Sequence, residues 1–221
     1  MSIVKYLEED QISEKSLTEQ LFARLLRDIL TEKIRRGSRL TEKSVCETYD
    51  VSRTPVREAL RQLEINGLIE TVPNRGAIVI GLDPQDVRDL ELIQIDLESR
   101  AAAWAVDRIT DEEMSQLTET FEFMEFYTAK SDAMKMRSIN AAFHRIIDSA
   151  THNRQFEQQL TMYWIYIRYC SPNADFSPNH LAVVLEEHRA IYQAFQSHDP
   201  IAGSHSMRVH LENGLRRRSA R

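Results

Sequence analysis

The segment from Val51 to Leu60, which reads VSRTPVREAL, constrains the fold of this chain more than any other. Ser52 is a residue type that caps helix N-termini, and Pro55 is tolerated in the first helical turn, where backbone N–H groups have no intrahelical partner. Arg53 and Arg57 are four residues apart and therefore share one helical face, whereas apolar side chains share another. One face packs and the other is free for recognition, as in a helix that enters a DNA groove.

The flanking segments predict what surrounds this helix. Residues 17–36 carry apolar side chains at helical spacing, Gly37 is a stop signal, and a short helix follows at 41–49 with Thr41 as its cap. After Asn66 and Gly67, residues 68–72 alternate in polarity, 73–76 have turn chemistry, and 77–80 form a second strand. Three helices plus a β-hairpin wing predict a winged helix-turn-helix.

The amino-acid sequence of the N-terminal segments resembles the DNA-binding domain of GntR-type bacterial transcription regulators. The segments that carry the resemblance are residues 39–42, 51–64, 66–69 and 74–77. The resemblance covers residues 17–81. It implies that the major groove and its phosphates are contacted by four residues, Lys43, Arg53, Thr54 and Arg57. It also implies that two residues, Arg75 and Gly76, lie at the wing tip near the minor groove. The alternative is that the cations are solvated surface charges.

Charge and length favour two domains. The 221 residues carry a net charge of −6, yet residues 17–81 hold 11 basic against 9 acidic side chains while residues 82–221 hold 15 against 21. A mildly basic head (residues 17–81) and an acidic body (residues 82–221) fit a specific DNA reader rather than a chain that coats nucleic acid. Residues 1–16 are expected to be a mobile extension. The absence of a long apolar run or a leader predicts a cytoplasmic protein with no membrane segment.

The body is predicted to be an antiparallel all-α six-helix bundle, so the whole chain is mainly α. Asp83 and Pro84 start the first helix, and the sequence Thr110 to Glu113 is a capping box for the second. The other four are expected at roughly 131–150, 153–171, 178–197 and 200–218, with a loop at 172–177. Cys46 and Cys170 fall in different predicted domains and are expected to be ordinary thiols.

Three histidines fall on apolar helical faces of the body. His188 fills the missing step of an apolar stripe, and His144 and His210 are flanked by apolar residues on two other predicted helices. One such histidine is usually a hydrogen-bonded core residue. Because each buried imidazole without a partner costs roughly 1–3 kcal/mol, three of them aimed at one core favour a shared ligand. Neutral imidazole is the commonest ligand of zinc, nickel, copper and ferrous ions.

The body also resembles the FCD ligand-binding domain of the FadR-like branch of GntR regulators. Many members of that branch bind a divalent metal through an aspartate, a histidine one turn later, and two histidines on the last two helices. The implied ligands here are Asn140, His144, His188 and His210, with Asn140 in place of the aspartate and zinc or nickel as the expected ion. Gln94, expected in the effector pocket, stands where relatives that hold a carboxylate effector often carry an arginine.

These features predict a transcription regulator, a repressor that binds a palindromic DNA operator as a homodimer. A small-molecule effector, an organic acid, would modulate its DNA affinity from the metal-containing body. One alternative keeps the DNA-binding head but gives the body a metal-free pocket or makes it an inert dimerisation bundle. The remote alternative is a metal-dependent hydrolase or isomerase, which requires a general base beside the metal. No His-Glu-x-x-His pattern occurs, so we expect no enzymatic activity.

Overall fold

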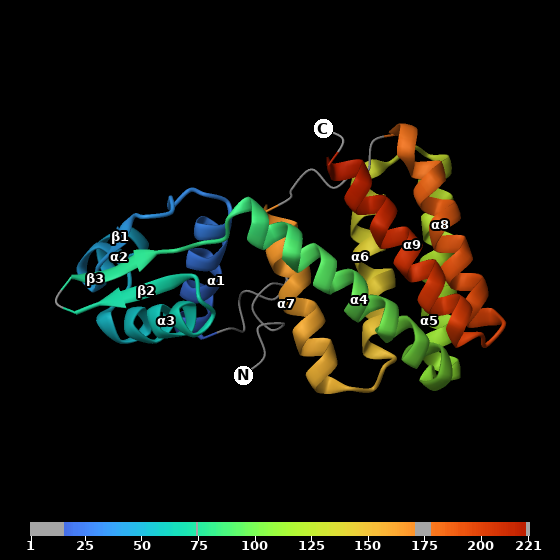
Figure 1. The fold of residues 1–221 in the computed structure, drawn as a ribbon, viewed down its shortest axis with the longest axis horizontal. Helices are drawn as coiled ribbons and strands as arrows, with labels where there is room; N and C mark the ends of the chain where they lie inside the picture. The colour runs from blue at the N-terminus through green and yellow to red at the C-terminus, as the bar shows by residue number, and fades with distance from the viewer. Residues whose placement is uncertain (1–15, 74, 171–177, 220–221) are drawn as a thin grey trace. The chain divides into compact units, whose positions relative to one another are not determined.

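The computed structural model describes residues 16–73, 75–170 and 178–219, which form nine helices and three strands (Figure 1). The expected extension at 1–16, apart from Ser16, and the expected loop at 172–177 lie outside the described residues. The elements of the head are α1 (Leu17–Leu30), β1 (Arg39–Leu40), α2 (Glu42–Tyr49), α3 (Arg53–Ile65), β2 (Ile69–Val72) and β3 (Gly76–Val79). Those of the body are α4 (Pro84–Arg108), α5 (Asp111–Ala129), α6 (Ala133–Ser149), α7 (Arg154–Cys170), α8 (Pro178–Gln196) and α9 (Pro200–Ser219).

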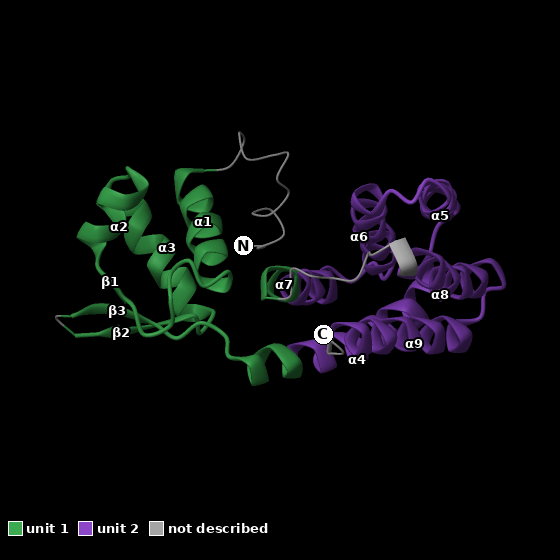
Figure 2. Cartoon of the chain, turned by 90° about the horizontal axis from the view of Figure 1, so that it is seen from above, with its two compact units in different colours: residues 1–89, 165–170 green, residues 90–164, 171–221 purple. Residues whose placement is uncertain are grey.

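Contacts divide the chain into two compact units, residues 1–89 with 165–170 and residues 90–164 with 171–221 (Figure 2). The mainly helical architecture confirms the predicted fold class, a winged helix-turn-helix followed by a six-helix bundle. Within the described parts of the chain, none of the helices combines the length and the apolar character needed to cross a bilayer.

The first helix is shorter than predicted. It ends at Leu30 rather than near residue 36, because the Thr31 hydroxyl bonds back to the Arg27 carbonyl and Glu32 adopts a left-handed conformation with φ of 56°. The released segment leads into β1, a strand that the sequence interpretation missed. β1 pairs with β3 and completes an antiparallel sheet of order β1-β3-β2, so the wing hairpin is anchored by a third strand.

The helix-turn-helix forms as expected, with one correction. Thr41 caps α2 through a reciprocal capping box with Ser44, whereas Ser52 occupies the N-cap position of α3 but its side chain makes no capping hydrogen bond. The orientation of α3 is therefore determined by packing. Its apolar stripe of Val56, Ala59 and Leu63 is fully buried, while Arg53 and Arg57 on the other face are exposed.

Gly76 begins β3 and is required by the backbone. Its φ is +83°, and a Cβ atom added there would lie 2.5 Å from the Leu40 carbonyl oxygen of β1. Both the left-handed conformation and the close approach favour glycine. The identity of this residue thus has a structural explanation in addition to the expected role at the wing tip.

The body buries one continuous apolar core. Aromatic and aliphatic side chains from α4, α5, α6, α8 and α9 contribute to it, including Phe121, Phe143, Ile191, Phe195 and Met207. Asp83 caps α4 by accepting from the backbone N–H groups of Gln85 and Asp86, and the Thr110 capping box opens α5, as predicted. The buried polar side chains of the body include Glu98, His144, His188 and His210, which come from α4, α6, α8 and α9.

Candidate metal centre and DNA-binding surface

Three imidazole rings from three helices meet inside the body. His144 of α6, His188 of α8 and His210 of α9 are buried, with relative exposures of 1%, 0% and 7%. Their ring centroids are 5.5, 5.2 and 4.3 Å apart, and one ligand atom of each lies within 4.8 Å of the others. The prediction that these three histidines share one core is confirmed, because the structure brings together rings separated by up to 66 positions in the chain.

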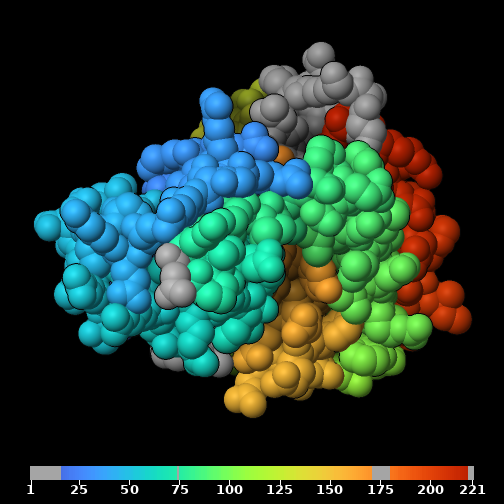
Figure 3. Space-filling model, turned by 60° about the vertical axis from the view of Figure 1, so that its left-hand side comes forward, coloured from blue at the N-terminus to red at the C-terminus, as the bar shows by residue number. Residues whose placement is uncertain are grey.

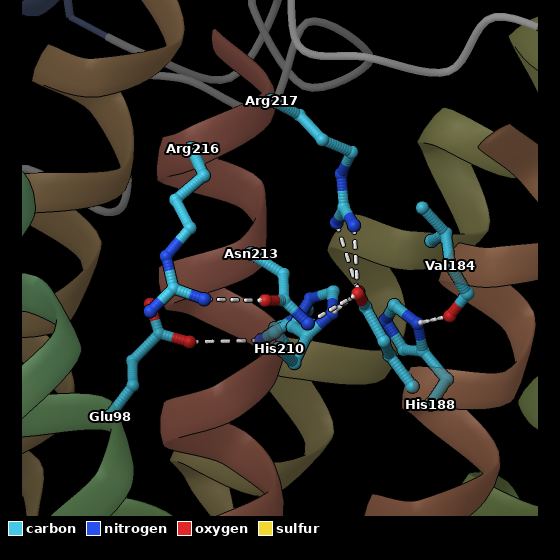
Figure 4. A network of polar contacts seen from close by, with 9 residues as sticks. Glu98, Val184, His188, His210, Asn213, Arg216 and Arg217 are labelled. Atoms are coloured by element: carbon cyan, nitrogen blue, oxygen red, sulfur yellow. Dashed lines mark hydrogen bonds and ion pairs between the residues drawn. The ribbon is translucent and has the colours of Figure 1, made fainter. Parts of the chain in front are cut away.

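The hydrogen bonds assign the tautomer of each ring. The Nδ1 atom of His144 lies 2.9 Å from the Glu98 carboxylate, that of His188 lies 2.7 Å from the Val184 carbonyl, and that of His210 lies 2.8 Å from a carboxylate oxygen of Glu187. Figure 4 shows these contacts around His188 and His210. Because carboxylate and carbonyl oxygens accept, each Nδ1 carries the proton and each Nε2 presents a lone pair.

Two of these three lone pairs have no hydrogen-bond donor among the described residues. The Nε2 atoms of His144 and His188 are buried and have no hydrogen-bond partner among the described residues. Three acceptors that face one another cannot form hydrogen bonds among themselves, so a purely hydrogen-bonded core does not explain the arrangement. A divalent cation fits it, because metal-binding histidines typically donate their other ring N–H to a carboxylate or a backbone carbonyl.

Electrostatics favour the metal-binding form of two of the rings, His188 and His210. Burial and the neighbouring His210 and His144 rings hold the pKa of His188 well below its usual value. Burial also lowers the pKa of His210, although the hydrogen bond to Glu187 acts in the opposite direction. Neutral imidazole is the metal-ligating form.

Two carboxylates that support the rings were missed by the sequence interpretation. Glu98 of α4 is completely buried and binds both His144 and the side-chain amide of Gln94. Glu187 of α8 bonds His210 of the next helix. The available signal was the spacing of Glu98, one helical turn after Gln94 and one before Ala102 on the buried face of α4.

Glu187 is held by three side chains of α9. It accepts from the Nδ1 of His210, from the Asn213 amide at 2.9 Å, and from both terminal nitrogens of Arg217 at 2.7 and 2.9 Å. Burial by itself raises the pKa of Glu187, but the hydrogen bonds from His210 and Arg217 outweigh it and bring the pKa to about 2. Glu187 is therefore an ionised anchor that joins α8 to α9.

The remaining candidate residues of the body lie close to this cluster in the fold. Gln94 is 4% exposed and donates to Glu98, and Asn140 precedes His144 by one helical turn, with its buried Oδ1 lacking a partner among the described residues. The Trp164 ring lies 5.0 Å from the His144 ring.

Asp148 is buried, and this burial together with Glu98 and Glu157 holds its pKa well above the usual value.

The candidate DNA-binding residues lie on the surface of the head. Arg53, Thr54 and Arg57 are exposed at the start of α3. In the space-filling view the head is coloured from blue to teal (Figure 3). The Arg57 side chain lies 2.7 Å from Glu42 of α2, and the Lys43 side chain is 83% exposed. Arg75 is also exposed, and its carbonyl accepts from the side chain of Arg39 in β1, which ties the tip of the wing to that strand.

Comparison with known proteins agrees with this architecture. Residues 17–79 match the family of bacterial regulatory proteins named gntR, and residues 90–213 match the FCD domain. An uncharacterised HTH-type transcriptional regulator YdhC of Bacillus subtilis is 27% identical over 197 residues, covering 88% of this chain and 87% of its own. The HTH-type transcriptional repressor RspR of Escherichia coli is 28% identical, with 89% and 86% covered.

A third relative, the Uxu operon transcriptional regulator of Escherichia coli, is 32% identical over 200 residues and covers 80% of this chain and 77% of its own. Among solved structures, Escherichia coli McbR/YncC has a TM-score of 0.70 at 21% identity, with 93% and 98% of the two chains covered. That similarity supports the fold.

The head and the body together define a class, the DNA-binding transcription regulators that join a helix-turn-helix to a helical ligand-binding domain. Within this class the chain belongs to the GntR family, in its FadR-like subfamily with an FCD domain. The relatives are transcription regulators rather than enzymes, which agrees with the expectation of no enzymatic activity. DNA and a small molecule are the partners that these two domains imply.

Proposed function

We propose that the protein is a cytoplasmic repressor that binds a palindromic operator as a homodimer. Residues 17–81 form the DNA-binding domain and residues 82–221 the effector-binding and dimerisation domain. Arg53, Thr54 and Arg57 enter the major groove with Lys43 at the phosphates, and the wing residues Arg75 and Gly76 approach the minor groove. The support for this docking is the exposure of all four cations at the start of α3, on α2 and at the wing.

The DNA-binding proposal is tested with an operator selected from random duplex DNA by the wild-type protein. Arg57→Ala and Arg53→Ala should each weaken binding by about 1–3 kcal/mol, roughly 5- to 150-fold, at constant salt. Arg208→Ala is the matched control, since Arg208 is a partly exposed arginine of the body that pairs with Asp96. Unchanged affinity in both α3 variants would exclude the proposed recognition face.

We further propose that the body holds a divalent ion, zinc or nickel, at His144, His188 and His210, with Asn140 as a weaker fourth ligand. The observation that carries this proposal is the convergence of three buried imidazole rings, two of which have an Nε2 atom without a partner among the described residues. An ion with three imidazole ligands retains open positions, and the carboxylate of an organic acid effector would take one of them. Binding of that effector would shift the dimer between arrangements with different operator affinity.

Metal analysis of the freshly purified protein tests the metal proposal directly. We expect close to one zinc or nickel ion per chain and a thermal transition that falls when a chelator is added. Asn140→Asp should bind the ion more tightly because it adds a negative charge to the ligand set. A metal-free protein that is indifferent to chelator and to Asn140→Asp would favour the alternative of a metal-free pocket or an inert dimerisation bundle.

A further inference from the structure

Glu98 differs from the other tightly held glutamates of the body in what it pairs with. Glu91 is bound by Arg218 at 2.8 Å, and Glu187 is bound by Arg217. Glu98 is completely buried, yet within the described parts of the chain it bonds only His144 and Gln94, and neither lysine nor arginine neutralises it. A buried carboxylate without a cationic partner costs several kcal/mol, so this one requires an explanation.

The geometry indicates where the missing cation belongs. Glu98 binds the Nδ1 side of His144, and the Nε2 atom on the opposite side of the same ring is buried, without a partner among the described residues, and directed into the histidine cluster. A cation at Nε2 would therefore be joined to the carboxylate through one imidazole. In such carboxylate–histidine–metal arrangements the carboxylate fixes the tautomer and increases the basicity of the ligand.

Because Asn140 is uncharged, Glu98 also affects the net charge of the proposed metal site. The four proposed ligands are three imidazoles and one amide, so the ligand set itself carries no negative charge. We propose that Glu98 is the positioning residue that supplies the site's negative charge from behind His144 and makes it competent for a divalent ion in spite of Asn140. This inference rests on the proposed metal centre.

The experiment measures zinc affinity of the full-length, metal-stripped protein by competition with a chromophoric chelator. Glu98→Gln keeps the size and a hydrogen-bond acceptor but removes the charge, and it should weaken zinc binding about 10- to 100-fold. Glu91→Gln is the matched control, because Glu91 is a buried glutamate on the same helix that contacts Arg218 rather than a histidine. We expect it to change zinc affinity by no more than about 3-fold, since it does not support a ligand.

Charge rescue separates this role from a purely structural one. Adding Asn140→Asp to Glu98→Gln returns a carboxylate to the site and should recover roughly tenfold of the lost affinity, whereas a packing defect would not be repaired. If Glu98→Gln does not fold, Gln94→Leu removes the amide that holds Glu98 while leaving its charge, and it should reduce zinc affinity by a smaller factor.

Each result decides between the claims. Four results would overturn the role of Glu98 while leaving the metal centre in place. Two are wild-type zinc affinity in Glu98→Gln and an equal loss of affinity in Glu91→Gln. The others are absence of rescue by Asn140→Asp and, where Gln94→Leu replaces Glu98→Gln, unchanged zinc affinity in Gln94→Leu. Absence of zinc or nickel binding in the wild-type protein would overturn the metal centre itself.

Discussion

The head and the body use opposite designs to place their functional groups. In the head, the candidate residues Arg53, Thr54 and Arg57 lie within five positions of one helix and point to solvent. In the body, the histidines come from three helices and are buried. The difference teaches that a surface site depends on one well-packed helix, whereas a buried site depends on several helices and on every partner that satisfies its polar atoms.

The largest expected effect concerns the body. His188→Ala should abolish the metal-dependent part of the thermal stability, which by mass action is about 2.7 kcal/mol when the ion is present at 100 times its dissociation constant. Scanning calorimetry with and without added zinc measures it. The metal-free variant should still bind operator DNA, because the three histidines belong to the unit that does not contain α3. A His188→Ala protein that keeps a full zinc-dependent shift would contradict the shared site.

The next effect concerns the backbone of the head. Gly76→Ala should destabilise the head by about 1–3 kcal/mol, because the positive φ and the contact with the Leu40 carbonyl both disfavour a side chain. Chemical denaturation followed by operator binding measures it. Gly37→Ala is the control: Gly37 also has a positive φ, but a Cβ atom there meets nothing within 4 Å. Equal losses in the two variants would show that the contact with β1 contributes nothing.

A third prediction uses the buried acid of α6. Burial, Glu98 and Glu157 raise the pKa of Asp148 in the folded protein. A raised folded pKa means that the contribution of Asp148 to stability is present below the pKa of the unfolded chain and is lost as pH rises through the folded value. Asp148→Asn should therefore raise the melting temperature above that of the wild type by more at pH 8 than at pH 4. For a chain of this length, each kcal/mol of added stability raises the melting temperature by roughly 2–4 °C.

Thermal melts of both proteins across this pH range measure the difference. Asp199→Asn is the control, since Asp199 is an exposed helix-capping residue. A difference in melting temperature between wild type and Asp148→Asn that is constant with pH would contradict the raised pKa.

The smallest expected effect returns to the head. Arg75→Ala should weaken operator binding by less than Arg57→Ala does, because a wing contact mainly positions the protein on the DNA backbone. Loss of this arginine should also reduce the slope of log affinity against log salt concentration by about the amount expected for one phosphate contact. Binding isotherms at several salt concentrations measure both quantities. A loss larger than that of Arg57→Ala would show that the wing, rather than α3, dominates recognition.

Much of the fold followed from local signals in the sequence. Helical periodicity and caps such as Thr41, Asp83 and Thr110 place most helix starts to within two residues, because these signals act within one turn of the chain. The strand β1 was missed because it depends on pairing with β3, which is nearly 40 residues away. Ser52 was expected to cap α3, and it occupies the N-cap position without a side-chain capping hydrogen bond.

The sequence alone determined that this protein is a winged helix-turn-helix joined to a helical body, and that three histidines of that body face inward. It did so because amphipathic periodicity records which face of each helix is buried. Only the tertiary structure decided which partners those histidines have, namely Glu98, Val184 and Glu187. These pairings join different helices or depend on side-chain direction, and the free energy that selects them, the satisfaction of buried polar atoms, exists only once the helices are packed.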